Sequence, residues 1–421
     1  MLITDSPVSS AIIGKRHASA IAIDRSHSYP EWRSVFDLDP DASPFQHPDY
    51  VFAELDRGVP CEKLSPVLLQ LGTGEECTGV GVLLPKTVRT GQVGGIGPGW
   101  NMLGLRLSGG SFLTIDESMD SQSALLSIAV RHCMSVGADF LLIEDLDEQS
   151  SLYRVVQHER THDYRLFAAR DIQPRWRIEL PAIEEDYWKT FSSRTRRAFR
   201  TRLKKFGQTR LERVTEVEQI PEFLNAAYEI SKQSWQSRQF GLRIRNDEFE
   251  LQQLSVLARH GFLRSYLWRV EEKPVAFALC HQHGGDFRYE EIAFCAEFSP
   301  LSPGETMLQQ IVEDLYRHKP PKCFDFGGGN AEYKRRFGNR ESRSQTVWLV
   351  PPTWRARSSL AYLNGCRGLR SIARRIVKTC GLATKARQWL RYGGRSDHAK
   401  AVAPEASNPE NETVSPERSG R

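Results

Sequence analysis

The order of apolar segments predicts an α+β fold with mostly antiparallel sheets. Within residues 171–350, two amphipathic helical segments precede three strand-like segments that are separated by short turns. One helical segment and a further strand follow, which is the pattern of a crossover in an otherwise antiparallel sheet. The chain has 421 residues, a length typical of two or three domains.

Changes in composition along the chain predict the domain organisation. We expect a first domain at 29–170 and a second domain at 171–350. Residues 1–28 are expected to be poorly ordered, and 351–398 to form a basic amphipathic helical segment. Residues 399–421 are rich in Pro, Ser, Asn and Glu, a composition typical of a disordered tail.

The first domain shows helical and strand-like patterns in alternation. Helices are predicted at 29–39, 43–55 and about 120–136, and strands at 66–71, 78–85, 139–146 and 164–170. A glycine-rich stretch at 91–104 is predicted to be a loop.

The second domain has clearer boundaries. Strands are predicted at 175–181, 262–270, 274–282, 286–295, 322–326 and 344–350, and helices at 186–207, 220–235, 246–261, 305–318 and 331–337. Asn246 is the expected N-cap of its helix, and Gly261 follows the end of the same helix.

Several classes of protein are excluded by the composition. Eight scattered cysteines without a C-x-x-C motif predict neither a zinc site nor a disulfide framework, and they favour a reduced, cytoplasmic protein. No apolar run approaches the ~18 residues of a membrane span, and we expect no signal peptide. His281 and His283 are two residues apart without an evident third ligand, so no metal site is predicted.

Positive charge is concentrated near the C-terminus. Residues 354–400 contain 12 Lys and Arg but only one acid, Asp397, whereas the whole chain has a formal charge of +5. Tryptophan, leucine and isoleucine alternate with these cations over 354–391, which is typical of peripheral contact with anionic membranes. A helix pair packed on the domain with a solvated cationic face is the alternative. Glycines at 365, 368 and 381 argue against one long helix.

The stretch "SPGET" at 302–306 opens the helix before the final strands. Ser302 and Glu305 suit a capping box, and Pro303 suits the first helical position. Gly304 has no such role, and glycine in a first turn costs ~1 kcal/mol relative to alanine. A helix start with free N–H groups suits a pyrophosphate, so we expect an anion site or, alternatively, a purely structural cap.

The stretch "CFDFGGGNAEYKRRFG" at 323–338 has three consecutive glycines. It matches neither the G-x-G-x-x-G fingerprint nor the P-loop pattern. We expect Asp325 on the strand, and Tyr333 and Lys334 facing a cleft shared with the preceding helix start. A tyrosine can return a proton to a leaving thiolate and a lysine can hold an anion. A flexible turn with a solvated helix face is the alternative.

Two further charged features are candidates for the site. Seven cations lie within 194–205, which fits an anionic ligand or a solvated face. The aromatic residues there are expected in the core and therefore not to stack on nucleic-acid bases.

Glu290 and Glu291 are adjacent on a strand, so alternation places one carboxylate on each sheet face. One of them is a candidate general base, with a surface charge as the alternative.

Taken together, "SPGETML", "FDFGGGNAEYKRRFG", "EWRSVFDL", "SPFQHPDY" and "SSRTRRAFRTRLKKFG" resemble GNAT-superfamily acyltransferases associated with cellulose and exopolysaccharide biosynthesis in bacteria. The resemblance covers roughly 30–350 and is strongest over 185–345. It implies two GNAT-like halves, as in the Fem peptidyltransferases, with acyl-CoA bound to the second half. Cys295 departs from the expected pattern, because a polar residue is usual there.

The resemblance also implies site roles. Ser302, Pro303, Gly304, Glu305 and Thr306 would bind the CoA pyrophosphate together with Lys334. Asp325, Tyr333 and Lys334 match the family pattern D-F-G-x-G-x-x-x-Y-K, and the candidate catalytic residues are Tyr333, Asp325 and Glu291.

The implied activity is an N-acyltransferase that uses acetyl-CoA or another acyl-CoA and no metal. The acceptor would be an amine, and no sequence-specific nucleic acid is expected as a partner. The alternatives are a Fem-like transferase that uses aminoacyl-tRNA and a non-catalytic component of polysaccharide machinery.

Overall fold

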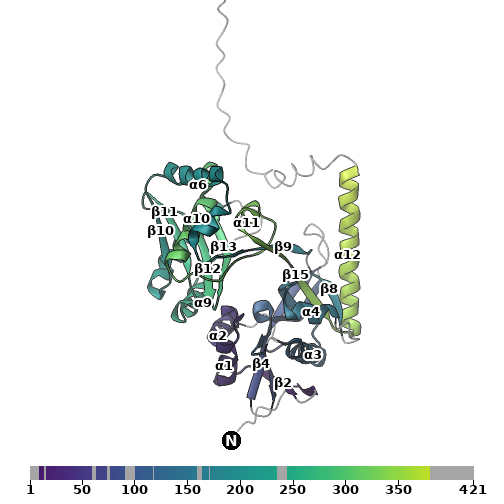
Figure 1. The fold of residues 1–421 in the computed structure, drawn as a ribbon. Helices are drawn as coiled ribbons and strands as arrows, with labels where there is room; N and C mark the ends of the chain where they lie inside the picture. Colours follow the sequence, from purple (N-terminus) through teal and green to yellow (C-terminus); the bar gives the residue numbers. More distant parts are fainter. Residues whose placement is uncertain are drawn as a thin grey trace, which may run out of the picture. The chain divides into compact units, whose positions relative to one another are not determined.

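A computed structural model shows how these segments are arranged (Figure 1). It describes residues 9–13, 16–58, 63–73, 76–90, 100–116, 118–158, 164–169, 171–234 and 244–379. Expectations for 1–8, 91–99 and 380–421 therefore lie outside the described residues. The chain forms two compact units, of which the first contains Met1–Thr90 and Pro98–Ala361 and the second contains Gly91–Gly97 and Tyr362–Arg421.

The N-terminal half of this unit contains ten main elements. In chain order they are β2 (Arg16–Ala22), α1 (Pro30–Leu38), α2 (Pro48–Asp56), β3 (Val67–Thr73), β4 (Glu76–Thr90), β5 (Trp100–Leu107), α3 (Met119–Ser135), β7 (Phe140–Asp147), α4 (Ser151–His158) and β8 (Arg165–Ala168). Four shorter elements accompany them: β1 (Ser9–Ile13), η1 (Pro44–Gln46), η2 (Ser108–Gly110) and β6 (Leu113–Thr114).

The C-terminal half repeats the same order. Its elements are β10 (Thr209–Val214), α7 (Ile220–Gln233), α9 (Glu248–Arg259), β11 (Ser265–Val270), β12 (Lys273–His283), β13 (Asp286–Phe294), α10 (Pro303–Arg317), β14 (Cys323–Gly328), α11 (Glu332–Phe337) and β15 (Arg340–Val350). Before it come β9 (Gln173–Glu179), α5 (Glu184–Lys189) and α6 (Ser193–Lys205). The short elements η3 (Val217–Gln219) and η4 (Ala296–Leu301) precede α7 and α10, and α12 (Trp354–Thr379) follows β15.

Each half is a mostly antiparallel sheet with one crossover. In the N-terminal half β2, β3, β4 and β5 are antiparallel neighbours, and α3 leads to β7, which runs parallel to β5. In the C-terminal half β10, β11, β12 and β13 are antiparallel, and α10 leads to β14, which runs parallel to β13. The predicted α+β class and the single crossover are confirmed.

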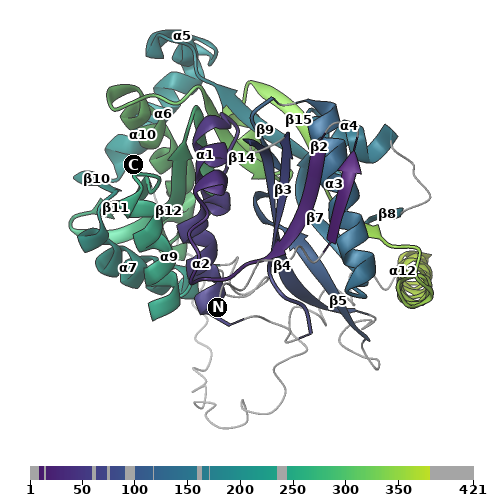
Figure 2. The same cartoon turned by 90° about the horizontal axis from the view of Figure 1, so that it is seen from below.

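Two strands join the halves into one continuous sheet. β15 pairs with β7 of the N-terminal half on one side and with β9 on the other, and β9 pairs with β14 of the C-terminal half. The strand at the end of the second repeat therefore lies beside the parallel strand of the first. Helices cover both faces of each half (Figure 2), which gives four apolar clusters.

Five local expectations differ from the structure. Residues 100–104, within the stretch expected to be a loop, belong to β5. Residues 9–13 and 16–22, within the segment expected to be poorly ordered, form β1 and β2. The helix predicted at 186–207 is divided into α5 and α6, because Ser192 caps α6 by accepting from the backbone N–H of Thr195. The N-cap of α9 is Asp247 rather than Asn246. Helix α12 continues through Gly365 and Gly368, since the cost of a single glycine is small beside the length of this helix.

Candidate active site

The central feature of the C-terminal half is a separation between two parallel strands. β13 and β14 pair only from Asp286 to Arg288 and from Cys323 to Asp325. Beyond this point the strands diverge, and their backbone groups face an opening instead of each other. The start of α10 and the helix α11 lie at the same opening.

A cavity of about 690 Å³ fills this opening, and we call it the donor cavity. It is lined by β13, by the start of α10 and by α11 with its preceding loop. The predicted site residues that line it are Glu291, Ser302, Gly304, Glu305, Tyr333 and Lys334. The structure therefore brings together six of the nine predicted residues in one place.

The start of α10 is uncapped, contrary to the predicted capping box. Ser302 has left-handed backbone angles (φ 54°, ψ 58°), and its side chain accepts no hydrogen bond from the helix. Glu305 does not fold back, because it pairs with Arg202 of α6 at 2.6 Å and with Arg336 of α11 at 2.8 Å. Among the described residues, the backbone N–H groups of Gly304 and Glu305 have no hydrogen-bond acceptor. They are therefore free to bind an anion.

Gly304 keeps the helix start open to the donor cavity. A Cβ atom added there would be 3.4 Å from Ile292 and 3.5 Å from Phe294, which is ordinary van der Waals contact. The packing of the protein itself does not require a glycine at this position. Pro303 is at the first helical position as predicted, and it is buried together with Thr306. Neither of these two residues lines the cavity.

Tyr333 and Lys334 lie at the start of α11. The ring of Tyr333 packs edge-on against Phe326, and burial raises the pKa of its hydroxyl, so the hydroxyl keeps its proton at neutral pH. The Nζ of Lys334 donates to the carbonyl oxygens of Phe326 at 2.6 Å and Gly328 at 2.9 Å. Burial lowers the pKa of Lys334. Its ammonium group is thus engaged in holding the glycine loop.

Asp325 is 2% exposed and lies in an ion-pair network between the halves. Its carboxylate accepts two hydrogen bonds from Arg175 of β9, and Arg175 also pairs with Asp145 of β7 at 3.0 Å. Burial alone would raise the pKa of Asp325, but the charges of Arg175 and Arg288 outweigh this effect and hold the pKa well below its usual range. These contacts position the glycine-rich end of β14, because Asp325 also accepts from the N–H of Gly327.

A β-bulge changes the expected placement of the two glutamates. Tyr289 pairs with Cys280 and Glu291 pairs with Leu279, so Glu290 is the extra residue of β13. Strict alternation is interrupted, and both Glu290 and Glu291 line the donor cavity. The expectation that they lie on opposite faces is wrong for this physical reason.

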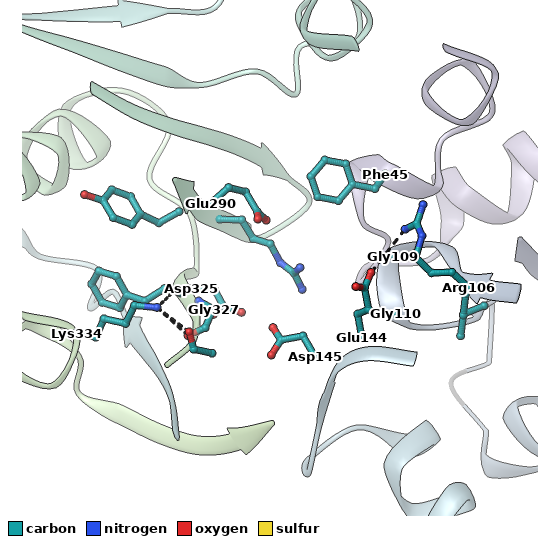
Figure 3. Close-up of a pocket in the computed structure, with 15 residues that line it drawn as sticks. Phe45, Arg106, Gly109, Gly110, Glu144, Asp145, Glu290, Asp325, Gly327 and Lys334 are labelled. Carbon is teal, nitrogen blue, oxygen red and sulfur yellow. Dashed lines mark hydrogen bonds and ion pairs between the residues drawn. The ribbon is translucent and has the colours of Figure 1, made fainter. Parts of the chain in front are cut away.

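A second cavity of about 340 Å³ lies between the two halves, and we call it the cleft cavity (Figure 3). The N-terminal half contributes Phe45, Arg106, Gly109, Gly110, Glu144 and Asp145, and the C-terminal half contributes Arg288, Glu290, Asp325, Gly327, Gly328 and Lys334, among others. Tyr289, Glu290, Phe326 and Lys334 line both cavities. The donor and cleft cavities therefore adjoin at these residues.

Glu290 is the carboxylate at this junction. Its side chain is 37% exposed, and among the described residues the ionisable group within 4.0 Å of its carboxylate is the Nε2 of His281 at 3.9 Å. Burial lowers the pKa of His281 to about 3, so this imidazole is neutral and does not balance the carboxylate. Partial burial raises the pKa of Glu290, although Arg288 acts in the opposite direction. A carboxyl with a raised pKa is suited to accept a proton from an amine.

The remaining histidines do not join these cavities. His281 packs against Phe45, and His283 stacks on Phe36, so the two do not form a pair of ligands. Within the described ranges one other group, His47, Asp49 and His260, has three ligand atoms within 4.8 Å of one another. Asp49 there already accepts from Arg33, and its other oxygen lies 2.8 Å from His260, which links α2 to α9.

Arg202, on the basic face of α6, pairs with Glu305 at the start of α10. Phe191, Phe199 and Phe206 are buried in the core, as the sequence predicts. Nucleic-acid bases therefore cannot stack on these rings.

The residues that sequence analysis missed come from segments far apart in the chain. Arg175, Arg288 and Phe45 carry no local signal for a site, although "SPFQ" was among the motifs of the resemblance. Gln46 of the same motif bonds to the backbone of Ser111, which fixes Phe45 beside the glycines of η2. Only the long-range pairing of the halves brings these residues together.

Comparisons with known proteins agree with this fold. Residues 193–335 match the family described as "Acetyltransferase (GNAT) domain". No curated protein sequence matches the chain significantly.

Among solved structures, FemX is similar over 78% of this chain and 97% of its own, with 14% identity and a TM-score of 0.55. The C-terminal domain of a putative lysylphosphatidylglycerol synthetase from Agrobacterium fabrum matches over 67% of this chain and 84% of its own, with 12% identity and a TM-score of 0.45. The match to FemX and the internal repeat confirm the predicted tandem GNAT-like fold, and the family match supports an acyl or aminoacyl transferase.

Proposed function

We propose that this tandem GNAT-fold protein is an acyl-CoA-dependent N-acyltransferase that acts on an amine. The observation that carries the proposal is the donor cavity, where β13 and β14 diverge beside the uncapped start of α10. The free N–H groups of Gly304 and Glu305 would hold the CoA pyrophosphate, with Arg202 and Arg336 beside them. The pantetheine arm would lie between the separated strands.

The acceptor amine would enter from the cleft cavity and meet the thioester at Glu290. Glu290 accepts a proton from the ammonium group, and the amine nitrogen then attacks the thioester carbonyl carbon. The carbon–sulfur bond breaks, the leaving thiolate takes a proton from Tyr333, and Tyr333 regains a proton from the nitrogen of the new amide. Glu290 releases its own proton to water. Backbone N–H groups released from sheet pairing at the bulge would stabilise the developing oxyanion. In this assignment Glu290 replaces Glu291 as the base, and Asp325 and Lys334 position the loop.

An acyl-CoA panel tests the donor assignment. We expect native mass spectrometry to show one acyl-CoA per chain at low micromolar concentration, and CoA release once an acceptor is added. A Fem-like transferase would bind aminoacyl-tRNA and leave every acyl-CoA free, and a non-catalytic component would bind neither. Absence of any CoA complex would contradict the proposal.

The cellular context is a further part of the proposal. The resemblance to exopolysaccharide-associated acyltransferases favours a role in envelope biosynthesis, and the free state of the described cysteines favours the cytoplasm. No helix within the described residues is long and apolar enough to span a membrane. Helix α12 has seven Lys and Arg and no acid in its sequence, which suits peripheral contact with an anionic membrane surface.

A further inference from the structure

The cleft cavity contains an unusual number of charged side chains, and most of them are neutralised by the protein. Arg106 pairs with Glu54 at 2.5 Å and also lies 4.0 Å from Glu144, and Asp145 pairs with Arg175 at 3.0 Å. The carboxylate of Asp325 forms an ion pair with the guanidinium group of Arg175. Lys334 is held by backbone carbonyl oxygens. These groups shape the cavity without needing a ligand.

Two charges in the same cavity have no hydrogen-bonded partner among the described residues, although the charge of Arg288 acts on Asp325 and Glu290 at longer range. Arg288 has no hydrogen bond or ion pair to any described residue, although it lines the cavity. Glu290 has only the neutral His281, at 3.9 Å, within ion-pair range among the described residues. Half-buried charges without a hydrogen-bonded partner are costly, so a ligand that brings opposite charges would be bound favourably.

The positions of Arg288 and Glu290 determine where the positive and negative groups of a ligand would bind. Arg288 and Glu290 are two residues apart on β13, and Glu290 is the extra residue of the bulge. Glu290 lines both cavities, whereas Arg288 lines only the cleft cavity. A ligand with its positive group at Glu290 thus has that group next to the donor cavity and its negative group at a residue that lines the cleft cavity alone.

We propose that the acceptor is a zwitterion in which a primary amine and a carboxylate or phosphate lie a few bonds apart. The amine binds at Glu290 and the acidic group binds at Arg288. This inference rests on the proposed function, since it names the substrate class for the same site.

The size of the cavity fits a small molecule or the end of a larger one. Its volume of about 340 Å³ is at the small end of ligand sites. Gly109 and Gly110 form part of the wall, and a Cβ atom at either would lie 2.5 Å from Gln46 or from the Glu144 carbonyl oxygen. A neighbouring cavity shares Phe45, Arg106 and Glu144 with the cleft cavity, so a larger acceptor has room to extend there.

Equilibrium binding tests the proposal without depending on turnover. Amino acids, dipeptides and glucosamine 6-phosphate would be titrated by calorimetry, each beside its neutral counterpart, the amide or glucosamine. We expect at least one acidic member to bind about tenfold or more tightly than its neutral form, because a charge-assisted pair with Arg288 is lost in the latter. Comparison of the amino acids and dipeptides with glucosamine 6-phosphate shows whether the acidic group that binds is a carboxylate or a phosphate.

The variant Arg288→Gln should abolish this preference, Arg288→Lys should restore part of it, and Arg131→Gln, an exposed change on α3, should leave it intact. Equal binding of acidic and neutral members, a preference that survives in Arg288→Gln, or no binding of any acidic member would overturn the proposal. CoA binding measured on the same samples separates the two claims. If the wild-type protein binds CoA but binds acidic and neutral acceptors equally, only the proposed acceptor class is contradicted. If it prefers acidic acceptors but does not bind CoA, only the proposed donor is contradicted.

Discussion

The two halves share one topology and the same short parallel pairing of three residue pairs, but they differ at the helix start and in the register of the neighbouring strand. In the N-terminal half, Ser118 caps α3 by accepting from the N–H of Ser121, and β4 and β5 pair without a register shift. In the C-terminal half, α10 is uncapped and β13 has a bulge at Glu290. The same fold therefore provides a closed structural module and an open binding module.

Two arginines illustrate the difference at corresponding positions. Arg106 ends the parallel pairing of β5 with β7, and Arg288 ends the pairing of β13 with β14. Both line the cleft cavity, yet Arg106 is neutralised by Glu54 and Arg288 has no such partner among the described residues. We infer that the N-terminal half builds the wall of the cleft and the C-terminal half holds the reacting groups.

The largest predicted effect concerns the link between the halves. Replacing Asp325 by Asn leaves the buried Arg175 without its main partner, so we expect the free energy of unfolding to fall by about 3–5 kcal/mol. Denaturant unfolding measures this, with Asp171→Asn at an exposed position as a control that should have little effect. A variant as stable as the wild type would show that Asp325 serves chemistry rather than structure.

The same carboxylate predicts a pH dependence of stability. Its pKa is lowered in the folded state from the ordinary value of 3.8, so the folded state binds its proton less readily. The stabilisation is fully present above pH values of about 4 and is lost as the pH falls. Acid unfolding of Asp325→Asn should therefore be less steep than that of the wild type.

The next effect distinguishes the two adjacent glutamates. We expect Glu290→Gln to lower kcat by about 10³-fold, because the amine then lacks its proton acceptor, and Glu291→Gln to lower it less than tenfold. In the wild type, activity should fall as the pH decreases through the raised pKa of Glu290. An equal decrease of kcat in both variants would contradict the assignment of Glu290 as the general base.

A smaller effect is predicted for the proton donor. Tyr333→Phe should lower turnover by about 10²-fold while acyl-CoA affinity changes little, since the ring still packs on Phe326. A more acidic leaving thiol depends less on protonation by Tyr333. Turnover of a thioester with such a thiol should therefore decrease less in Tyr333→Phe. Wild-type turnover in the variant would leave the tyrosine with a packing role alone.

Sequence analysis predicted the second half better than the first. "SPGET" and "FDFGGG" are local signals for a helix start and a strand end, and both elements are present. The bulge at Glu290 has no local signal, because it depends on the register with β12. Arg175 and Asp325 are 150 residues apart, so their pairing could not be predicted from local patterns. Strand β5 was missed because glycines precede and interrupt it.

The smallest effect concerns α12, outside the paired halves. We expect full-length protein to sediment with anionic vesicles and not with neutral ones, in a salt-dependent manner. Replacing Arg370, Arg374, Arg375 and Lys378 by Gln keeps the length of the chain and should reduce this recovery several-fold. Equal recovery of both proteins in the supernatant would contradict membrane contact.

Calorimetry with CoA on charge variants of the two helix starts tests the central claim most directly. Gly304→Glu places bulk and negative charge where the pyrophosphate would bind, and Met119→Glu places the same charge in the first turn of α3. The account predicts that Gly304→Glu stays folded by circular dichroism but binds CoA at least 100-fold more weakly, with wild-type affinity in Met119→Glu. A folded Gly304→Glu variant that binds CoA as the wild type does would contradict it.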